Sequence, residues 1–433
     1  MKAPSENFVL AFVFVSSYIV RAAFVLMLNY GIFNAALVGG DSKLYFEIAE
    51  NLINGNGFAA NGHATAFVSP LFPWFISGSI SIFGKNPLAI TLLQQIFSAL
   101  ACVYIAKSAG LLFQSKRIEL IAGLLAAFNL ELILWGSIQL ITEPLYICFL
   151  AAAIMTLIAA IKTDSALQFA LSGALFALAS LTRPISIALW FGVLIFLIFR
   201  SAILKTQILR ISWFFVLFIL VMLPWGIRNH FVMGKFTFSS LESGHVFWLG
   251  NNSQYDRYDH KDMVEFGGYT AMIMPDKAML QALANKSEAE SNDYFFQKAT
   301  DHILENPKAF LIRAGNKNWN MWRPTFSNSS FRNKLFSYTV YPVMLLLSLF
   351  GMALAFVNSG KSFLERITSP AFVLIIILLG NVLIHSTVTG EIRFRVPLWV
   401  ILIPFAAFAL NWCFNSFAPV RKFLTPIVQQ LRL

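Results

Sequence analysis

Long apolar runs separated by short polar loops make up most of this 433-residue chain. Most of the runs approach the roughly twenty residues that a helix needs to cross a bilayer, and such a helix satisfies its own backbone hydrogen bonds in lipid. The pattern predicts about ten membrane-spanning helices, at residues 8–28, 86–110, 119–135, 143–161, 167–182, 185–199, 209–226, 336–357, 370–388 and 395–414. A shorter run at 70–83 contains Pro70 and Pro73, and we interpret it as a surface or re-entrant helix.

The composition supports an all-α polytopic membrane protein, because 58% of the residues are hydrophobic and only 12% are charged. The net charge of +11 does not indicate nucleic-acid binding, since the basic residues lie in short loops between apolar runs. With a cytoplasmic N-terminus, all clearly basic short loops fall on the inner side, as the positive-inside rule expects. An additional span at 70–83 would invert every later loop. Both termini are therefore predicted to be cytoplasmic.

Two long segments remain on the outer side. The predicted organisation is an N-terminal transmembrane module (1–228) with a first outer loop at 29–85, an outer loop domain (229–335), and C-terminal transmembrane helices (336–433). The outer domain is predicted to be a small mixed α/β segment, with strands or turns around 236–250 and an acidic helix at 287–305. Residues 306–322 predict an interfacial helix, or alternatively a solvated helix with aromatic belt residues.

The first outer loop contains the stretch GGDSKLYFEIAENLINGNGF, residues 39–58. If Asp41 opens a helix, Leu44, Tyr45, Ile48 and Leu52 share one face and Lys43 lies on the other. The stretch therefore predicts an amphipathic surface helix with a carboxylate at its N-terminal end. A purely structural alternative is that Asp41 or Ser42 only caps the helix.

Ionisable residues at the outer ends of the spans form a second pattern. They lie on the same side of the membrane as Asp41, and they are Glu143, Arg183, Arg228, His385, Glu391, Arg393 and Arg395. Such groups are costly in lipid and tend to line a site. Taken singly, each has a structural alternative: Glu143 suits a helix start, and the arginines can snorkel to lipid phosphates.

Taken together, these residues predict an outward-facing cavity at the membrane boundary. A carboxylate there suits a general base that takes a proton from an incoming hydroxyl. Arginine forks bind a departing phosphate bidentately. A phosphate carried on a lipid would explain why the cavity lies at the membrane edge.

Motifs along nearly the whole chain resemble the C-type-fold membrane glycosyltransferases. The resemblance is to the bacterial branch similar to dolichyl-phosphate-mannose protein mannosyltransferases and the lipid A aminoarabinose transferase. It is carried by GGDSKLYFEIAENLINGNGF, SPLFPWFISGSISIFG, TEPLY, LTRP, PWGIRNHFVMGKFTFSS, HVFWLGNN, ENPKAFLIRAGNKNWNMW and RFRVP, in this order.

The resemblance implies that Asp41 is the catalytic base of the first outer loop. It also implies a polyprenyl-phosphate sugar donor and transfer on the outer face of a bacterial inner membrane. Many relatives have Asp-Glu where this chain has Asp41-Ser42, and some have Glu-Lys where it has Val68-Ser69. These departures speak against aminoarabinose transfer, and Glu143 is a candidate second acid.

The expected partners are the lipid-linked donor, membrane lipids and an acceptor that is a lipid, a glycan or a protein. The candidate substrate-binding residues are Lys43, Tyr45, Arg183, Arg228, His385, Arg393 and Arg395. No metal-ligand spacing is found: His63, His245, His260 and His385 are scattered, and Asp256, Asp259 and Asp262 lack the pattern of a calcium loop. No cofactor is assigned, and a divalent metal stays open.

Two other functions fit parts of the pattern. A lipid-linked glycan polymerase or ligase would share the donor and the outward-facing chemistry. A transporter or flippase of a charged lipid or sugar would share the arginine-lined cavity, but it would place polar residues at mid-span depth. Span centres such as 149–158 and 372–380 are almost wholly apolar, which disfavours transport.

Overall fold

The computed structural model describes residues 6–29, 40–205, 208–257, 273–324, 331–360 and 362–416. Residues 30–39 of the first outer loop, His260, Asp259 and Asp262 lie outside the described part. So do four of the basic residues on which the predicted inner side of the membrane depends, namely Lys361, Arg421, Lys422 and Arg432. The side chain of Asp256 is also outside the described part.

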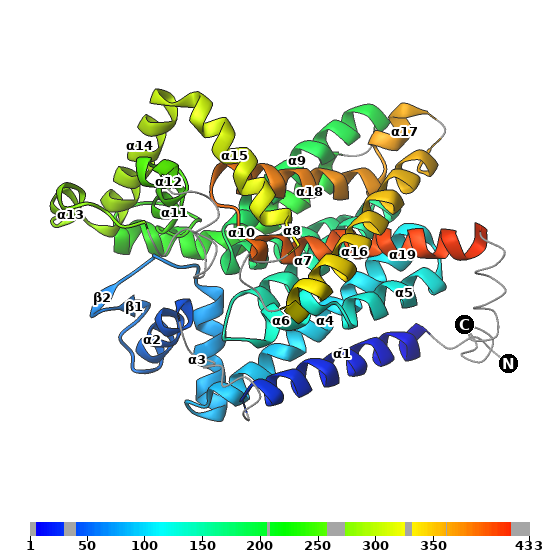
Figure 1. Ribbon diagram of the computed structural model, residues 1–433, viewed down its shortest axis with the longest axis horizontal. Coiled ribbons are helices and arrows are strands. Elements are labelled where there is room, and N and C mark those ends of the chain that lie inside the picture. The colour runs from blue at the N-terminus through cyan, green and yellow to red at the C-terminus, as the bar shows by residue number, and fades with distance from the viewer. Residues whose placement is uncertain are drawn as a thin grey trace.

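The molecule is an elongated bundle of helices (Figure 1). Its N-terminal half contains α1 (Glu6–Asn29), α2 (Asp41–Ile53), β1 (Ala59–Ala60), β2 (His63–Ala64), α3 (Leu71–Phe83), α4 (Pro87–Phe113), α5 (Lys116–Ala127), α6 (Leu130–Ser137), α7 (Glu143–Thr163), α8 (Ala166–Thr182), α9 (Ile185–Leu204) and α10 (Ile208–Met233). The C-terminal half contains α11 (Ser243–Leu249), α12 (Ser253–Arg257), α13 (Lys277–Leu283), α14 (Glu288–Glu305), α15 (Pro307–Trp322), α16 (Phe331–Asn358), α17 (Phe363–Ile367), α18 (Pro370–Thr387), the 3₁₀-helix η2 (Ile392–Leu398) and α19 (Trp399–Ser416).

Within the described residues, eight helices are long and apolar enough to cross a membrane, or nine if the bent pair α5 and α6 forms one span. The predicted span at 119–135 is this pair, which is bent by 45°. The predicted span at 167–182 is α8, a helix of only 17 residues. The run at 70–83 is α3, whose 13 residues are too few to cross a bilayer. The all-α polytopic membrane fold is confirmed.

A buried arginine lies at the bend between α5 and α6. Arg21 of α1 is fully buried, and its guanidinium donates to the carbonyl oxygens of Ala126 (3.1 Å) and Ala127 (2.9 Å) at the end of α5. It also donates to Ser98 Oγ of α4 at 2.7 Å. The last carbonyls of a helix lack intrahelical donors, so Arg21 stabilises the early end of α5 inside the bundle.

The interior of the bundle is built around α7, in which 83% of the membrane-spanning stretch is buried. Helices α8 and α10 pack closely at Gly173, which has no side chain. A Cβ on Gly173 of α8 would lie 2.1 Å from the carbonyl oxygen of Phe214 in α10. Any larger residue at Gly173 would force α8 and α10 apart.

The short helices and both strands gather at one end of the bundle, which we call the outer end. In Figure 1, α2, β1, β2 and α11 to α14 lie on the left, whereas α1 begins and α19 ends on the right. In the first outer loop, α2 packs on α3 through Tyr45 and Phe72, whose ring centroids are 5.2 Å apart. Helix α2 is amphipathic as predicted, with Ile48 and Ala49 buried.

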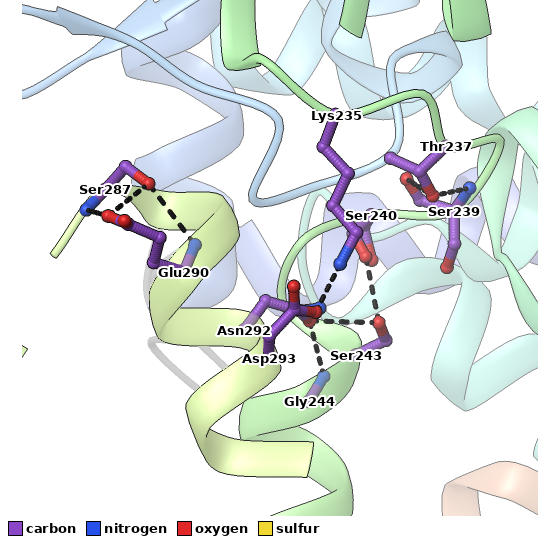
Figure 2. A network of polar contacts seen from close by, with 10 residues as sticks. All are labelled: Lys235, Thr237, Ser239, Ser240, Ser243, Gly244, Ser287, Glu290, Asn292 and Asp293. Carbon is purple, nitrogen blue, oxygen red and sulfur yellow. Dashed lines mark hydrogen bonds and ion pairs between the residues drawn. The ribbon is translucent and has the colours of Figure 1, made fainter. Parts of the chain in front are cut away.

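In the described part of the outer segment at 229–335, the regular elements are helices joined by turns such as 234–242, so the strands expected in a mixed α/β segment are not found there. Residues 243–249 form α11, and the molecule's two-residue strands β1 and β2 pair in the first outer loop instead. Helix α11 packs closely on α14 (Figure 2): Asn292 Oδ1 accepts from the Gly244 amide at 2.8 Å. A Cβ on Gly244 would lie 2.1 Å from the Asn292 carbonyl.

Helix α14 begins at the predicted acidic stretch. Ser287 and Glu290 form a capping box at its N-terminus, and Asp293 pairs with Lys235 (Figure 2). The next helix, α15, exposes Ile312 and Trp319, as an interfacial helix does.

Two basic residues of α15, Arg313 and Lys317, are buried rather than turned to the solvent. Lys317 Nζ donates to Asn251 Oδ1 (3.2 Å) and to the Thr387 carbonyl (3.1 Å). These contacts join α15 to α18 and to the end of α11.

Candidate active site

A cavity of about 440 Å³ lies at the outer end, where the first outer loop meets the bundle. Its walls come from α2, α7, the turn between α8 and α9, α18, η2, and the outer helices α11 and α14. Its polar and ionisable lining residues are Asp41, Tyr45, Ser69, Thr142, Tyr146, Thr182, Arg183, Ser240, Glu242, Ser243, Asn381, His385, Thr389 and Arg393. The structure therefore brings together residues that are up to 352 positions apart, from Asp41 to Arg393.

Asp41 is the first residue of α2, and its side chain is 61% exposed. Arg393 Nη1 lies 3.6 Å from Asp41 Oδ2, and Arg393 Nε lies 3.7 Å from Glu391 Oε2. Ser42, the alternative capping residue, has a buried hydroxyl without a hydrogen-bond partner, and neither side chain caps α2. The capping alternative is therefore wrong, and the Asp41 carboxylate faces an arginine and open space.

Arg183 follows α8 and lies on another wall of the cavity. Its Nη1 is 3.2 Å from Oε1 of Glu143, a carboxylate that is almost completely buried. The guanidinium also lies near the rings of Tyr146 (5.9 Å to the centroid) and Phe394 (5.8 Å). The ion pair with Arg183 offsets the free-energy cost of burying the Glu143 carboxylate, because a buried charge is stable only with a partner. Glu143 thus lies behind Arg183 rather than on the cavity wall.

Tyr45 and His385 complete the predicted residues that line the cavity. Burial, and then the charges of Asp41 and Glu242, raise the pKa of the Tyr45 hydroxyl, so it stays protonated and can donate. His385 Nδ1 lies 3.1 Å from the Thr389 carbonyl, and its ring stacks on Phe394 at 4.5 Å. Both side chains offer polar groups beside the charged ones.

Glu242 is a site residue that the sequence analysis did not single out. It immediately precedes α11 and lines the same cavity as Asp41. Burial, followed by the charge of Asp41, raises its pKa to about 7, although Arg393 and Arg183 oppose the shift. Glu391 has a raised pKa for the same first reason, burial, while Arg393 lowers it. An acidic residue just before a short helix was the only signal for Glu242 in the sequence.

Two predicted phosphate-binding residues lie elsewhere. Arg228 donates to the carbonyl oxygens of Thr65 (2.8 Å) and Phe58 (3.0 Å), so it joins α10 to the strands of the first outer loop. It does not line the cavity. Lys43 is exposed on the opposite face of α2 and does not line it either.

Arg395 is also outside the cavity, although it is only two residues from Arg393. It is buried and pairs with Glu131 of α6, with 3.1 Å between Nε and Oε1. Its Nη1 donates to the Met321 carbonyl at 3.0 Å, and Trp399 Nε1 donates to Glu131 Oε2 at 2.7 Å. In the 3₁₀-helix η2, with about three residues per turn, residues two positions apart point in different directions, so Arg393 reaches the cavity and Arg395 the bundle.

The membrane-side part of the cavity is mostly apolar. Ile185 and Ala188 of α9 face Asn381 and Ile384 of α18 there, inside two of the helices long enough to span a membrane. Asn381 is one turn before His385 on α18. The lining of the cavity therefore combines charged side chains with apolar side chains of two spanning helices. No group of three or more His, Cys, Asp or Glu side chains that could hold a metal ion occurs in the described ranges.

Comparison with known proteins agrees with this architecture. Residues 67–225 match the protein family described as dolichyl-phosphate-mannose-protein mannosyltransferase. No curated protein matches the chain. The fold is similar to that of the Archaeoglobus fulgidus oligosaccharyltransferase AglB in complex with an inhibitory peptide and a dolichol-phosphate (TM-score 0.58, 15% identity, 95% of this chain and 52% of that one). The apo form of the Archaeoglobus fulgidus oligosaccharyltransferase gives a TM-score of 0.52 at 16% identity, over 96% of this chain and 52% of that one.

A lower similarity, with a TM-score of 0.42 at 15% identity, is to ArnT from Cupriavidus metallidurans in the apo state; it covers 89% of this chain and 78% of that one. The chain spans about half the length of the oligosaccharyltransferase chains, 52% in each case. The resemblance to C-type-fold membrane glycosyltransferases is confirmed by the family match over 67–225 and by the fold shared over nearly the whole chain.

Proposed function

We propose that this protein is a membrane glycosyltransferase that moves a sugar from a polyprenyl-phosphate donor to an acceptor hydroxyl. One observation carries the proposal: the Asp41 carboxylate and two arginines, Arg183 and Arg393, line one cavity whose wall also includes apolar side chains of α9 and α18. A lipid phosphate matches both parts, because its head carries negative charge and its chain is apolar. The family match and the shared fold support the same class.

In this mechanism Asp41 is the general base. It accepts the proton of the acceptor hydroxyl, whose oxygen attacks the anomeric carbon of the sugar with inversion. The bond from that carbon to the phosphate oxygen breaks, and its electron pair stays on the phosphate. Arg183 and Arg393 stabilise the departing phosphate through charged hydrogen bonds.

Glu143 has a positioning role in this proposal. Its carboxylate holds the Arg183 guanidinium from behind at 3.2 Å, so the arginine stays directed at the cavity. The predicted contributions of Arg228, Arg395 and Lys43 to phosphate binding are not part of the proposal, since these side chains lie outside the cavity. The positive-inside pattern supports a bacterial inner-membrane orientation with the cavity on the outer side.

The test is native mass spectrometry of lipids that co-purify with the wild type and with Asp41→Asn. We expect the wild type to carry bare polyprenyl phosphate, the product, and the variant to retain the glycosylated lipid. Loss of a general base lowers a rate by about 10²- to 10⁴-fold, so Asp41→Asn should also lose sugar transfer in reconstituted membranes.

The matched control is Glu50→Gln, the same change of acid to amide on the same helix. Glu50 pairs with Lys85 at the surface, 2.7 Å away, and its variant should behave as the wild type. Near-normal transfer by Asp41→Asn would contradict the assigned base. Bulk phospholipid alone in both proteins would contradict the donor class.

One specific observation favours an alternative, the transfer of a whole glycan chain. The fold is shared with an oligosaccharyltransferase, so an oligosaccharide on the retained lipid would favour transfer of a glycan chain over a single sugar. The mass of the retained lipid distinguishes the two.

A further inference from the structure

Among the described residues, carboxyl groups outnumber arginines on the cavity wall and directly behind it. Four carboxyl groups lie on or directly behind its walls, but only two arginines oppose them. The acids are Asp41, Glu143, Glu242 and Glu391, and the cations are Arg183 and Arg393. With every acid ionised, the cavity would carry an excess of two negative charges and would repel a phosphate.

The ion pairs show which acid is left over. Glu143 pairs with Arg183, while Asp41 and Glu391 share Arg393. Within the described part of the chain, the Glu242 carboxyl forms no hydrogen bond or ion pair, although it lines the cavity. A carboxyl held in a partly buried place without a cation favours its protonated form, in agreement with its pKa near 7.

Titratable and charged groups face Glu242 from each neighbouring element. Asp41, Tyr45, Arg183 and Arg393 are close enough to interact electrostatically with Glu242. Tyr146 and His385 line the same cavity, and Glu143 and Glu391 lie behind it on the two arginines. On the helix that follows Glu242, the His245 ring packs against Phe295 at 4.9 Å. The helix α14 contributes the apolar Phe296 to the cavity.

The entry of a lipid phosphate changes this balance. The phosphate adds negative charge beside Arg183 and Arg393 and weakens their ability to oppose an ionised Glu242. A protonated carboxyl has an O–H donor that a phosphate oxygen accepts, whereas an ionised one repels it. Tyr45 also donates, but it carries no charge that titrates near neutral pH.

Resting on the proposed function, we propose that Glu242 is protonated in the donor complex and donates its hydrogen bond to the lipid phosphate, so that donor binding takes up one proton. Glu242 thereby contacts the substrate directly and sets the pH range in which the donor binds. The role is distinct from that of Asp41, which must be ionised to act as a base.

The experiment measures binding of a polyprenyl phosphodiester analogue to the full-length protein in nanodiscs between pH 6 and 8.5. This probe keeps one negative charge across that range. For the wild type, affinity should fall as pH rises through about 7, and roughly tenfold or more should be lost by pH 8.5 because one proton is linked to binding. Glu242→Gln keeps a donor that does not titrate, so its affinity should stay nearly constant.

Two further variants make the result specific. Glu242→Asp retains a titrating carboxyl and should retain the pH dependence, whereas Glu305→Gln, at an exposed site outside the cavity, should match the wild type. The same pH dependence in Glu242→Gln and the wild type would overturn the inference and leave the proposed donor class standing. Absence of probe binding by every protein at every pH would overturn both.

Discussion

Two pairs of arginines come from similar positions at the outer ends of spanning helices, yet they do different things. Arg228 and Arg395 donate to main-chain carbonyl oxygens, and Arg395 also to the partly buried carboxylate of Glu131. Arg183 and Arg393 end on carboxylates and aromatic rings beside open space. The first pair holds chain segments together, whereas the second has donors left for a ligand.

The difference lies in what the guanidinium meets. Its five N–H donors form a fixed fork, and carbonyl oxygens from two segments can occupy most of them permanently. A carboxylate at 3.6 Å, as between Arg393 and Asp41, is a looser partner that a phosphate can replace. The groups that an arginine contacts therefore distinguish the arginines that hold chain segments together, here called framework arginines, from those that can bind a ligand. Position in the sequence does so less well.

The largest effect is expected at Arg395. Replacing Arg395 with Met leaves the partly buried Glu131 without its cation, and breaking a buried ion pair typically costs about 3–5 kcal/mol. The unfolding midpoint in detergent should drop strongly. The double variant Arg395→Met with Glu131→Gln should recover much of the loss, because no unpaired charge remains. An unchanged midpoint in the single variant would place Arg395 outside the framework.

A smaller effect of a different kind is expected at Arg393. Arg393→Met should weaken binding of the polyprenyl phosphodiester about 10- to 100-fold, since a hydrogen bond to a charged group contributes about 1.5–3 kcal/mol. Its unfolding midpoint should stay close to that of the wild type. If stability fell as far as in Arg395→Met while probe affinity stayed normal, the distinction between the two pairs would be lost.

The smallest effect is expected at Arg228. Arg228→Lys keeps the charge but cannot reach the carbonyl oxygens of Phe58 and Thr65 together. Loss of one such bond costs about 1 kcal/mol, so we expect a slight drop in the unfolding midpoint and faster proteolysis of the 58–66 stretch. The affinity for the polyprenyl phosphodiester should be retained. A loss of affinity as large as that of Arg393→Met would indicate that Arg228 binds the donor.

The helical membrane fold was predictable because length and hydropathy decide it. Eight of the ten predicted spans are single helices long enough to cross a membrane, whereas α8 is shorter. The predicted span at 119–135 is broken after Ala127, a break that depends on Arg21 reaching the end of α5 from another helix. Hydropathy does not record such a contact. Of the strands or turns expected around 236–250, the structure has turns up to Glu242 and the helix α11 from Ser243. A short apolar stretch has no clear period, and tertiary packing of α11 on α14 decided its structure.

The candidate site was predictable in part. Asp41, Tyr45, Arg183, His385 and Arg393 do line one cavity, and the sequence placed all of them on one side of the membrane. It did not separate Arg393 from Arg395, because their divergence arises in the η2 turn. Nor did it identify Glu242, whose distinguishing property is the lack of a partner in three dimensions.

The stretch 58–66 has a consequence for engineering. Glu288 accepts from the Thr65 hydroxyl and the Ala66 amide, both at 2.8 Å, and the Leu241 amide donates to the Ala66 carbonyl at 2.8 Å. The same stretch is bound to α2 through Asn51 and Glu47. A chimera that takes its outer segment from a relative must therefore take the first outer loop from the same parent, because the two segments form one interlocking unit around Asp41.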